Sequence, residues 1–204
     1  MGNVAPGLPN RGKGYHGGTP TSIGRSVDLE GTEVQFQDDT VVTGSAPNLK
    51  RSGRTVVARL VRNSSGVALL PGRVVSWETG FHGTRVDGYV TTTAAAAAGV
   101  VDDRFAAAGV PDDELFWLIR QGPCLIKNNI AAAAGTVITE GAYVVALTAA
   151  TSQATTAGRI TNQTLTGATD VLAGQIQNRI GKAMSAKTTA NTNVDVLIDL
   201  ELQP

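Results

Sequence analysis

Short runs in which apolar and polar residues alternate recur along much of the chain. Residues 33–37 alternate polar and apolar side chains, as a half-buried β-strand does. Other short runs are rich in β-branched residues and are separated by turn signals such as Pro71-Gly72. These runs lie at residues 56–62, 73–77, 86–92, 115–120, 124–127, 142–147 and 194–202. Regularly spaced short strands predict an all-β domain, as a β-barrel or a sandwich.

Helical periodicity is confined to one place. Apolar residues at helical spacing within residues 169–180 predict a single helix there, which Gly174 weakens. The alanine runs 94–98 and 131–134 are too short for an independent helix. We therefore expect close-packed loops at both alanine runs.

The first thirty residues have a different composition. Residues 1–30 are rich in glycine and proline and hold few apolar side chains to offset the entropy of ordering. They are either a disordered tail or an arm that orders on a neighbouring subunit, with Tyr15 and His16 as its anchors. Residues 43–54 have the composition of a linker. We expect an extended N-terminal arm and linker over residues 1–50 and a β-domain over residues 51–204.

Charge is balanced over the chain but unevenly distributed. Lys plus Arg equals Asp plus Glu, so no net field favours nucleic acid or an anionic membrane. No acid lies between Asp39 and Glu78, whereas six bases do, and from Glu78 to Glu140, both included, eight acids face four bases. The six bases are Lys50, Arg51, Arg54, Arg59, Arg62 and Arg73. This pattern indicates contact between copies or docking on an acidic surface, the alternative being an ordinary solvated surface.

Arg51 and Arg54 are the best docking candidates in the basic window. Both lie in the linker, whereas Arg59 and Arg62 are three apart in a predicted strand and face opposite sides, so one of them can support the fold. No aromatic residues interleave with these bases, so nucleic-acid bases would lack stacking partners. Nor does any apolar segment approach the ~20 residues of a membrane span. We expect no nucleic acid and no membrane among the partners, and synthesis in a cytoplasm.

A search for catalytic chemistry finds no supported site. Cys124, the one cysteine, lies in an apolar run and is expected to be a buried small hydrophobe rather than a nucleophile. His16 and His82 have no second ligand at metal-binding spacing. The acidic residues 112–114 follow Pro111, which is typical of a turn. We expect no catalytic residues, cofactor, metal or small-molecule substrate.

Several strings resemble parts of the small capsid decoration (cement) proteins of tailed bacteriophages. Residues 70–75 resemble their turn-plus-strand, and residues 98–103, running on to 116–123, resemble another segment. Residues 179–184 followed by 194–200 look like their closing hairpin. The likeness covers residues 55–204, with residues 148–175 as an expanded loop.

The resemblance implies a compact β-barrel or tulip-like domain without catalytic residues. It implies a structural virion protein on the capsid exterior that stabilises the lattice by bridging major capsid proteins. The implied partners are the major capsid protein and other copies of the chain in a homotrimer. Two alternatives stay open: another virion component (minor head, tail or fibre), or a carbohydrate-binding β-domain. The second would usually cluster exposed aromatics, whereas the nine aromatics here are scattered in sequence.

Overall fold

The computed structural model describes a β-structure without helices. It describes residues 30–38, 53–90, 97–127, 137–146, 158–162, 179–186 and 195–202. Within these ranges no helix is present, and so none could cross a membrane. The strands are β1 (Glu33–Gln37), β2 (Thr55–Asn63), β3 (Val74–Trp77), β4 (Arg85–Tyr89), β5 (Ala97–Val101), β6 (Leu115–Ile126), β7 (Tyr143–Ala146), β8 (Ile160–Asn162), β9 (Arg179–Ala183) and β10 (Val196–Glu201). The all-β prediction is confirmed.

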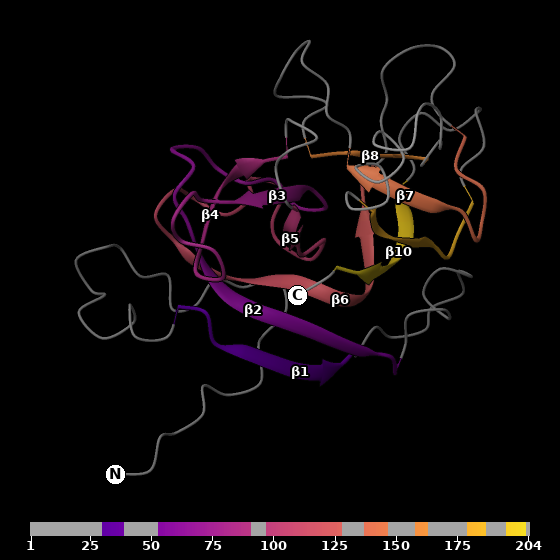
Figure 1. The fold of residues 1–204 in the computed structure, drawn as a ribbon, viewed down its shortest axis with the longest axis horizontal. Coiled ribbons are helices and arrows are strands. Elements are labelled where there is room, and N and C mark those ends of the chain that lie inside the picture. The colour runs from indigo at the N-terminus through magenta and orange to yellow at the C-terminus, as the bar shows by residue number, and fades with distance from the viewer. Residues whose placement is uncertain are drawn as a thin grey trace.

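The strands form one sheet of ten strands (Figure 1). Their order is β1-β2-β4-β3-β5-β6-β10-β9-β7-β8, and β2 also pairs with β6. That extra pairing joins β2, β4, β3, β5 and β6 in a ring of hydrogen-bonded neighbours. All pairs are antiparallel except β2 and β4, which run parallel. A closed barrel or tulip-like shape stays a prediction.

The core consists of two hydrophobic clusters on opposite faces of the central strands. In β2, Leu60 packs in the larger cluster and the next residue, Val61, in the smaller one. In β6, Trp117 and Phe116 divide between the two clusters in the same way. Successive residues of a strand point to opposite faces, so each central strand contributes to both clusters. This explains why these strands are nearly continuous apolar runs, whereas β1 alternates.

β6 is one continuous strand of twelve residues, not the two strands predicted on either side of residues 121–123. Its first part pairs with β2, and its second part, from Gln121, pairs with β10. Gly122 has a φ of 92° and Pro123 lies opposite Asp199 in the β10 register. The Gly-Pro step therefore marks the change of partner strand rather than a break. The prediction was wrong because pairing resumes at once with β10.

Three further expectations are corrected where strands replace loop or helix. Ala97 and Ala98 begin β5, which pairs with β3 and β6, and at the next residue, Gly99, a Cβ would clash with Leu118. β8 lies within the expected loop 148–175 and pairs with β7. Ile180, the end of the predicted helix, is in β9, while residues 169–178 lie outside the described residues. β9 pairs antiparallel with β10, as the expected closing hairpin requires.

Cys124 and Trp117 lie in the core. Cys124 is fully buried, as expected of a small hydrophobe, and its thiol lies 3.7 Å from Asp103 Oδ1. Trp117 is 4% exposed and belongs to the larger cluster. Trp77 is only partly buried and packs at the margin of the smaller cluster. Of the two tryptophans, Trp117 is thus the core residue.

Candidate interaction surface

Glu30 fixes the point at which the N-terminal arm leaves the domain. Its carboxylate is 6% exposed and accepts a 2.6 Å hydrogen bond from Arg62 Nε. Arg85 Nε contacts the other carboxylate oxygen at 3.3 Å. Arg62, 7% exposed, also donates through Nη1 to the carbonyl and the Oδ1 of Asp113 at 2.8 and 2.9 Å. Glu30, the last residue of the expected arm, is thus held by its charge pairs with Arg62 and Arg85.

Electrostatics strengthen the attachment of Glu30. Burial by itself lowers the pKa of the Arg62 guanidinium, but its hydrogen bonds to Glu30 and Asp113 outweigh burial and the pKa is raised. Arg62 therefore stays charged, and a charged group in this buried position needs its acidic partners.

Two β-bulges bracket the pairing of β1 with β2. At one end Gly31 (φ 88°) donates to Leu60 O, and Leu60 N donates to Thr32 O, so two residues oppose one. At the other end Gly53 donates to Asp38 O, and Asp38 N donates to Arg54 O. In both bulges the first residue is a glycine with positive φ, which other residues rarely adopt. β1 is thus fixed in register at both ends.

Asp38, the residue directly after β1, is buried despite its charge. It is 2% exposed, and Arg104 Nη2 donates to its carboxylate at 3.1 Å. Asp39 lies outside the described residues. β1 therefore lies on the arm side of the expected boundary at residues 43–54, yet it belongs to the same sheet as β2.

The turn between β3 and β4 gathers aromatic and cationic side chains. Phe81 is 42% exposed, and the Arg85 guanidinium lies 4.2 Å from its ring centroid. The His82 and Trp77 rings stack with centroids 6.4 Å apart at 28°. Arg120 lies 5.4 Å from the Trp77 centroid. Burial lowers the pKa of Arg120, and the nearby Arg59 charge lowers it further, while Glu33 opposes the shift.

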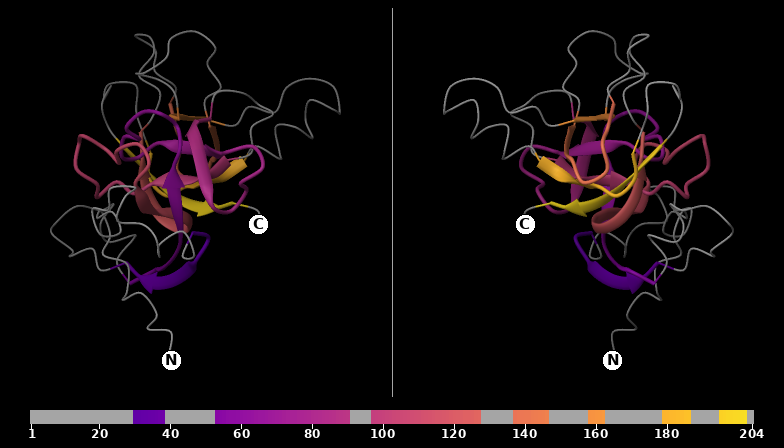
Figure 2. Two further views of the ribbon diagram at one scale, coloured as in Figure 1. Left: turned by 90° about the vertical axis from the view of Figure 1, so that its left-hand side faces the viewer. Right: turned by 90° about the vertical axis from the view of Figure 1, so that its right-hand side faces the viewer.

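The β3–β4 turn and the origin of the arm form one surface. Arg85 contacts both Phe81 and Glu30, which joins the turn to the start of the described chain. Arg59 Nη2 bonds to Glu33 of β1 at 2.8 Å, and a Cβ added at Gly83 would lie 3.2 Å from Arg59 Nη1. We call this the arm-root surface; it comprises Glu30, Glu33, Arg59, Trp77, Phe81, His82 and Arg85. Figure 2 shows β1, in indigo, along the lower margin of the fold, where this surface begins.

Of the four residues predicted as interface candidates, the structure describes only Arg54. Tyr15, His16 and Arg51 lie outside the described residues. Arg54 is 42% exposed, and its Nη2 bonds to Asp199 Oδ2 at 2.6 Å. The role of Arg54 in docking stays a prediction.

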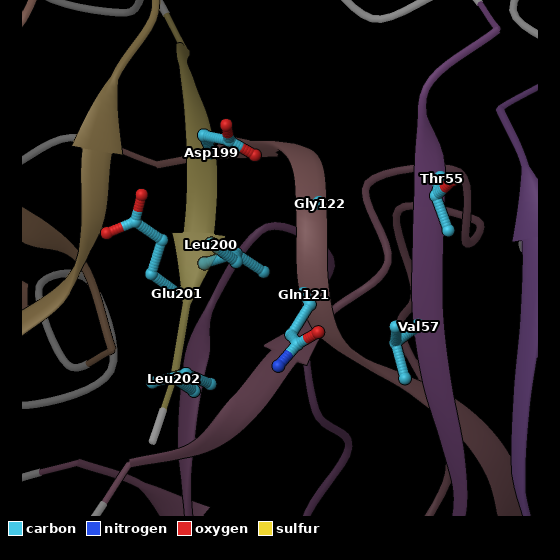
Figure 3. Close-up of a pocket in the computed structure, with 8 residues that line it drawn as sticks. All are labelled: Thr55, Val57, Gln121, Gly122, Asp199, Leu200, Glu201 and Leu202. Atoms are coloured by element: carbon cyan, nitrogen blue, oxygen red, sulfur yellow. The ribbon is translucent and has the colours of Figure 1, made fainter. Parts of the chain in front are cut away.

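Arg54 lies beside a groove of about 450 Å³ where β6 changes partners. Figure 3 shows Gly122 on β6, with Asp199 of β10 on one side and Thr55 of β2 on the other. The lining residues are Thr55, Val57, Gln121, Gly122, Asp199, Leu200, Glu201 and Leu202. The groove is half polar and holds two carboxylates, one of which is already bound by Arg54.

The basic window seen in the sequence is largely neutralised by folding. Arg54 pairs with Asp199, Arg59 with Glu33, and Arg62 with Glu30 and Asp113. Each acid lies outside the basic window, and only folding brings it close. The charge of these three arginines is therefore matched by acids that are distant in sequence, not by close sequence neighbours.

The acidic residues after Pro111 form a turn, as predicted. Asp113 has a φ of 63°, and Asp112 Oδ1 accepts a hydrogen bond from Gly66 N at 2.8 Å. In the described part of the chain, no three His, Cys, Asp or Glu side chains are grouped so that they could hold a metal ion.

Sequence analysis missed Glu30 and Phe81, two residues central to the arm-root surface. Glu30 has no local signal, because its partners Arg62 and Arg85 are distant in sequence. Phe81 gave a weak signal, as an isolated aromatic residue in a glycine-rich turn. A large apolar side chain in such a turn is worth considering as a contact residue.

Comparison with known proteins adds no relative. The chain matches no protein-family model, and no similar protein was found among curated proteins.

Proposed function

We propose that this chain is a structural protein that attaches to a larger protein assembly through the arm-root surface and the arm that leaves it. The observation that carries the proposal is the buried binding of Glu30 beside an exposed aromatic turn. A tether is effective when its origin is fixed, because a fixed origin sets the volume that the tether searches. Aromatic residues and arginine, which meet in the β3–β4 turn, dominate the binding energy of protein interfaces.

The particular assembly we propose is the outer surface of a tailed-phage head. There the chain would stabilise the capsid lattice by bridging major capsid proteins, as the resemblance over residues 55–204 implies. The fold is compatible with this proposal, since the strings that carry the resemblance form the turn into β3, β5, β6 and the β9–β10 pair. We propose a trimeric arrangement on the same ground.

The test measures binding of purified protein to undecorated heads of the phage that encodes it. Full-length protein should bind. Phe81→Ala should raise the dissociation constant about tenfold, as expected for an interface aromatic. Removal of residues 1–28, which leaves Glu30 in place, should also weaken binding.

Val137→Ala is the matched control. Val137 is 43% exposed, like Phe81, but precedes β7 on another part of the sheet. If Phe81→Ala and Val137→Ala bind equally, the arm-root surface is not the contact. If no form binds heads while the full-length chain binds a glycan, the carbohydrate-binding alternative replaces this proposal.

A further inference from the structure

The outer edge of β1 carries backbone groups without a strand partner in the described chain. β1 is the end strand of the sheet, with β2 as its neighbour. Thr32 and Asp38 form backbone hydrogen bonds with β2, so the backbone N–H and C=O groups of the even-numbered residues of β1 point toward β2. Backbone direction alternates along an antiparallel strand, so the N–H and C=O groups of Glu33, Gln35 and Gln37 point outward. Such an edge is a template for another strand.

The side chains of β1 show the same incomplete packing. Val34 and Phe36 are only partly buried where they pack against the larger cluster. Their register partners Ala58 and Val56 in β2 are fully buried. A strand added outside β1 would cover the apolar side of Val34 and Phe36 as well as pair the backbone.

We propose that the occupant of this edge is the segment of residues 21–29 from a second copy of the chain. This segment lies outside the described residues, and its sequence has the pattern of a strand. Ile23, Val27 and Leu29 fall on one face of an extended chain together with Arg25, whereas the residues on the other face are polar or small. It is also free of proline, whereas Pro6, Pro9 and Pro20 precede it and lack an N–H to donate.

The geometry at Glu30 explains why the occupant comes from another copy. Only residues 30–32 separate Leu29 from β1, and all three are bound. Glu30 binds Arg62, while Gly31 and Thr32 bond to Leu60 of β2. For residues 21–29 of the same copy to pair with the outer edge of β1, the chain would have to turn back in a hairpin. Such a hairpin needs at least two loop residues, and the residues available for the loop are already bound to β2. The same segment of a neighbouring copy has no such restriction, so exchange of arms links copies of the chain.

The experiment is sedimentation velocity on the purified full-length chain without heads, so its outcome is separate from that of the proposed function. The wild-type chain should self-associate with increasing concentration. Gln35→Pro removes an outward N–H and leaves the bonds to β2, and edge strands accept proline. It should weaken self-association, raising its dissociation constant Kd about tenfold.

A second variant tests the occupant without touching the domain. Ile23→Asp/Val27→Asp should weaken self-association at least as much, whereas Ser22→Asp/Ser26→Asp adds equal charge on the other face and should leave it nearly unchanged. Circular dichroism and urea midpoints check that each variant is folded. A wild-type chain that stays monomeric at all concentrations would overturn the proposal. So would self-association that neither Gln35→Pro nor Ile23→Asp/Val27→Asp weakens.

Discussion

Arg62 shows how one residue of the basic window serves the fold. It lies in the ring of paired strands, and its guanidinium reaches acids from two separate segments, Glu30 and Asp113. A buried charge with its partners in place contributes little net stability, but the same charge without them is strongly unfavourable. The strength of this contact therefore becomes visible when one partner is removed.

Glu30→Gln or Arg62→Met should lower the free energy of unfolding by about 3 kcal/mol, because each breaks a buried charge pair. The loss should stay at the low end for a buried pair, because Arg62 keeps Asp113 and Glu30 keeps Arg85 as a remaining partner. Urea unfolding of the full-length chain measures this. Arg59→Gln is the control, since its pair with Glu33 is 28% and 43% exposed and should contribute no more than about 1 kcal/mol. Equal losses for Arg59→Gln and Arg62→Met would show that the Glu30 contact is not a buried anchor.

Glu114 has the opposite effect on stability. Burial, and the neighbouring charge of Asp113, raise its pKa above 4.5. Between 4.5 and the raised pKa the folded state binds more protons than the unfolded state, so stability falls as pH rises through this range. At pH 7 the ionised carboxylate destabilises the fold.

Glu114→Gln should therefore raise the free energy of unfolding at pH 7. The gain should disappear below pH 4.5, where the wild-type carboxyl is protonated in both states. Thermal unfolding at pH 7 and pH 4 measures both, with exposed Asp87→Asn as a control that should change little. An equal gain at the two pH values would mean that ionisation of Glu114 is not the cause.

At the scale of elements, Gly122 allows β6 to pair with two strands. Its φ is 92°, and a Cβ added there would collide with the backbone of Thr55 in β2. Gly122→Ala should destabilise the fold by about 2–4 kcal/mol, from backbone strain together with overpacking. Gly66 has a φ of 75° but no atom within 4 Å of an added Cβ, so Gly66→Ala should show the strain alone, about 1 kcal/mol. Similar urea midpoints for the two variants would contradict this account of β6.

Sequence predicted the elements whose side chains follow a simple pattern. Residues 33–37 alternate, and residues 56–62 are rich in β-branched side chains, so β1 and β2 were found. β5 begins with Ala97 and Ala98, which have weak strand preference, and it is held by pairing with β3 and β6, where Gly99 leaves no room for a Cβ beside Leu118. The Gly-Pro step of β6 predicts a turn in isolation, and only pairing with β10 keeps it extended.

The candidate surface was less predictable than the fold. Arg54, Arg59 and Arg62 looked like an uncancelled patch because their acidic partners lie 26 to 145 residues away. Glu30 lies next to the glycine-rich arm, and nothing nearby in sequence marks it as buried. Contacts of such long range depend on the tertiary fold, which local patterns do not encode.

At the scale of the whole molecule, we propose a β-domain with an N-terminal arm that is tethered at Glu30. The arm-root surface joins the edge of β1, the fixed Glu30 and the aromatic β3–β4 turn. A second contact through Arg51 and Arg54 remains our prediction from the sequence. If it exists, Arg51→Glu/Arg54→Glu should slow association with heads at low salt and have little effect at high salt, because exposed charges are screened. Equal association rates at both salt concentrations would exclude this contact.

The copy number of the protein in purified phage heads tests the central claim most directly. Quantitative mass spectrometry of heads separated from tails should find it in a fixed, capsomer-like ratio to the major capsid protein. Protease treatment of intact heads should cleave it before the major capsid protein, as expected for an outer position. Its absence from heads, or its presence only in tail fractions in a few copies, would contradict the account.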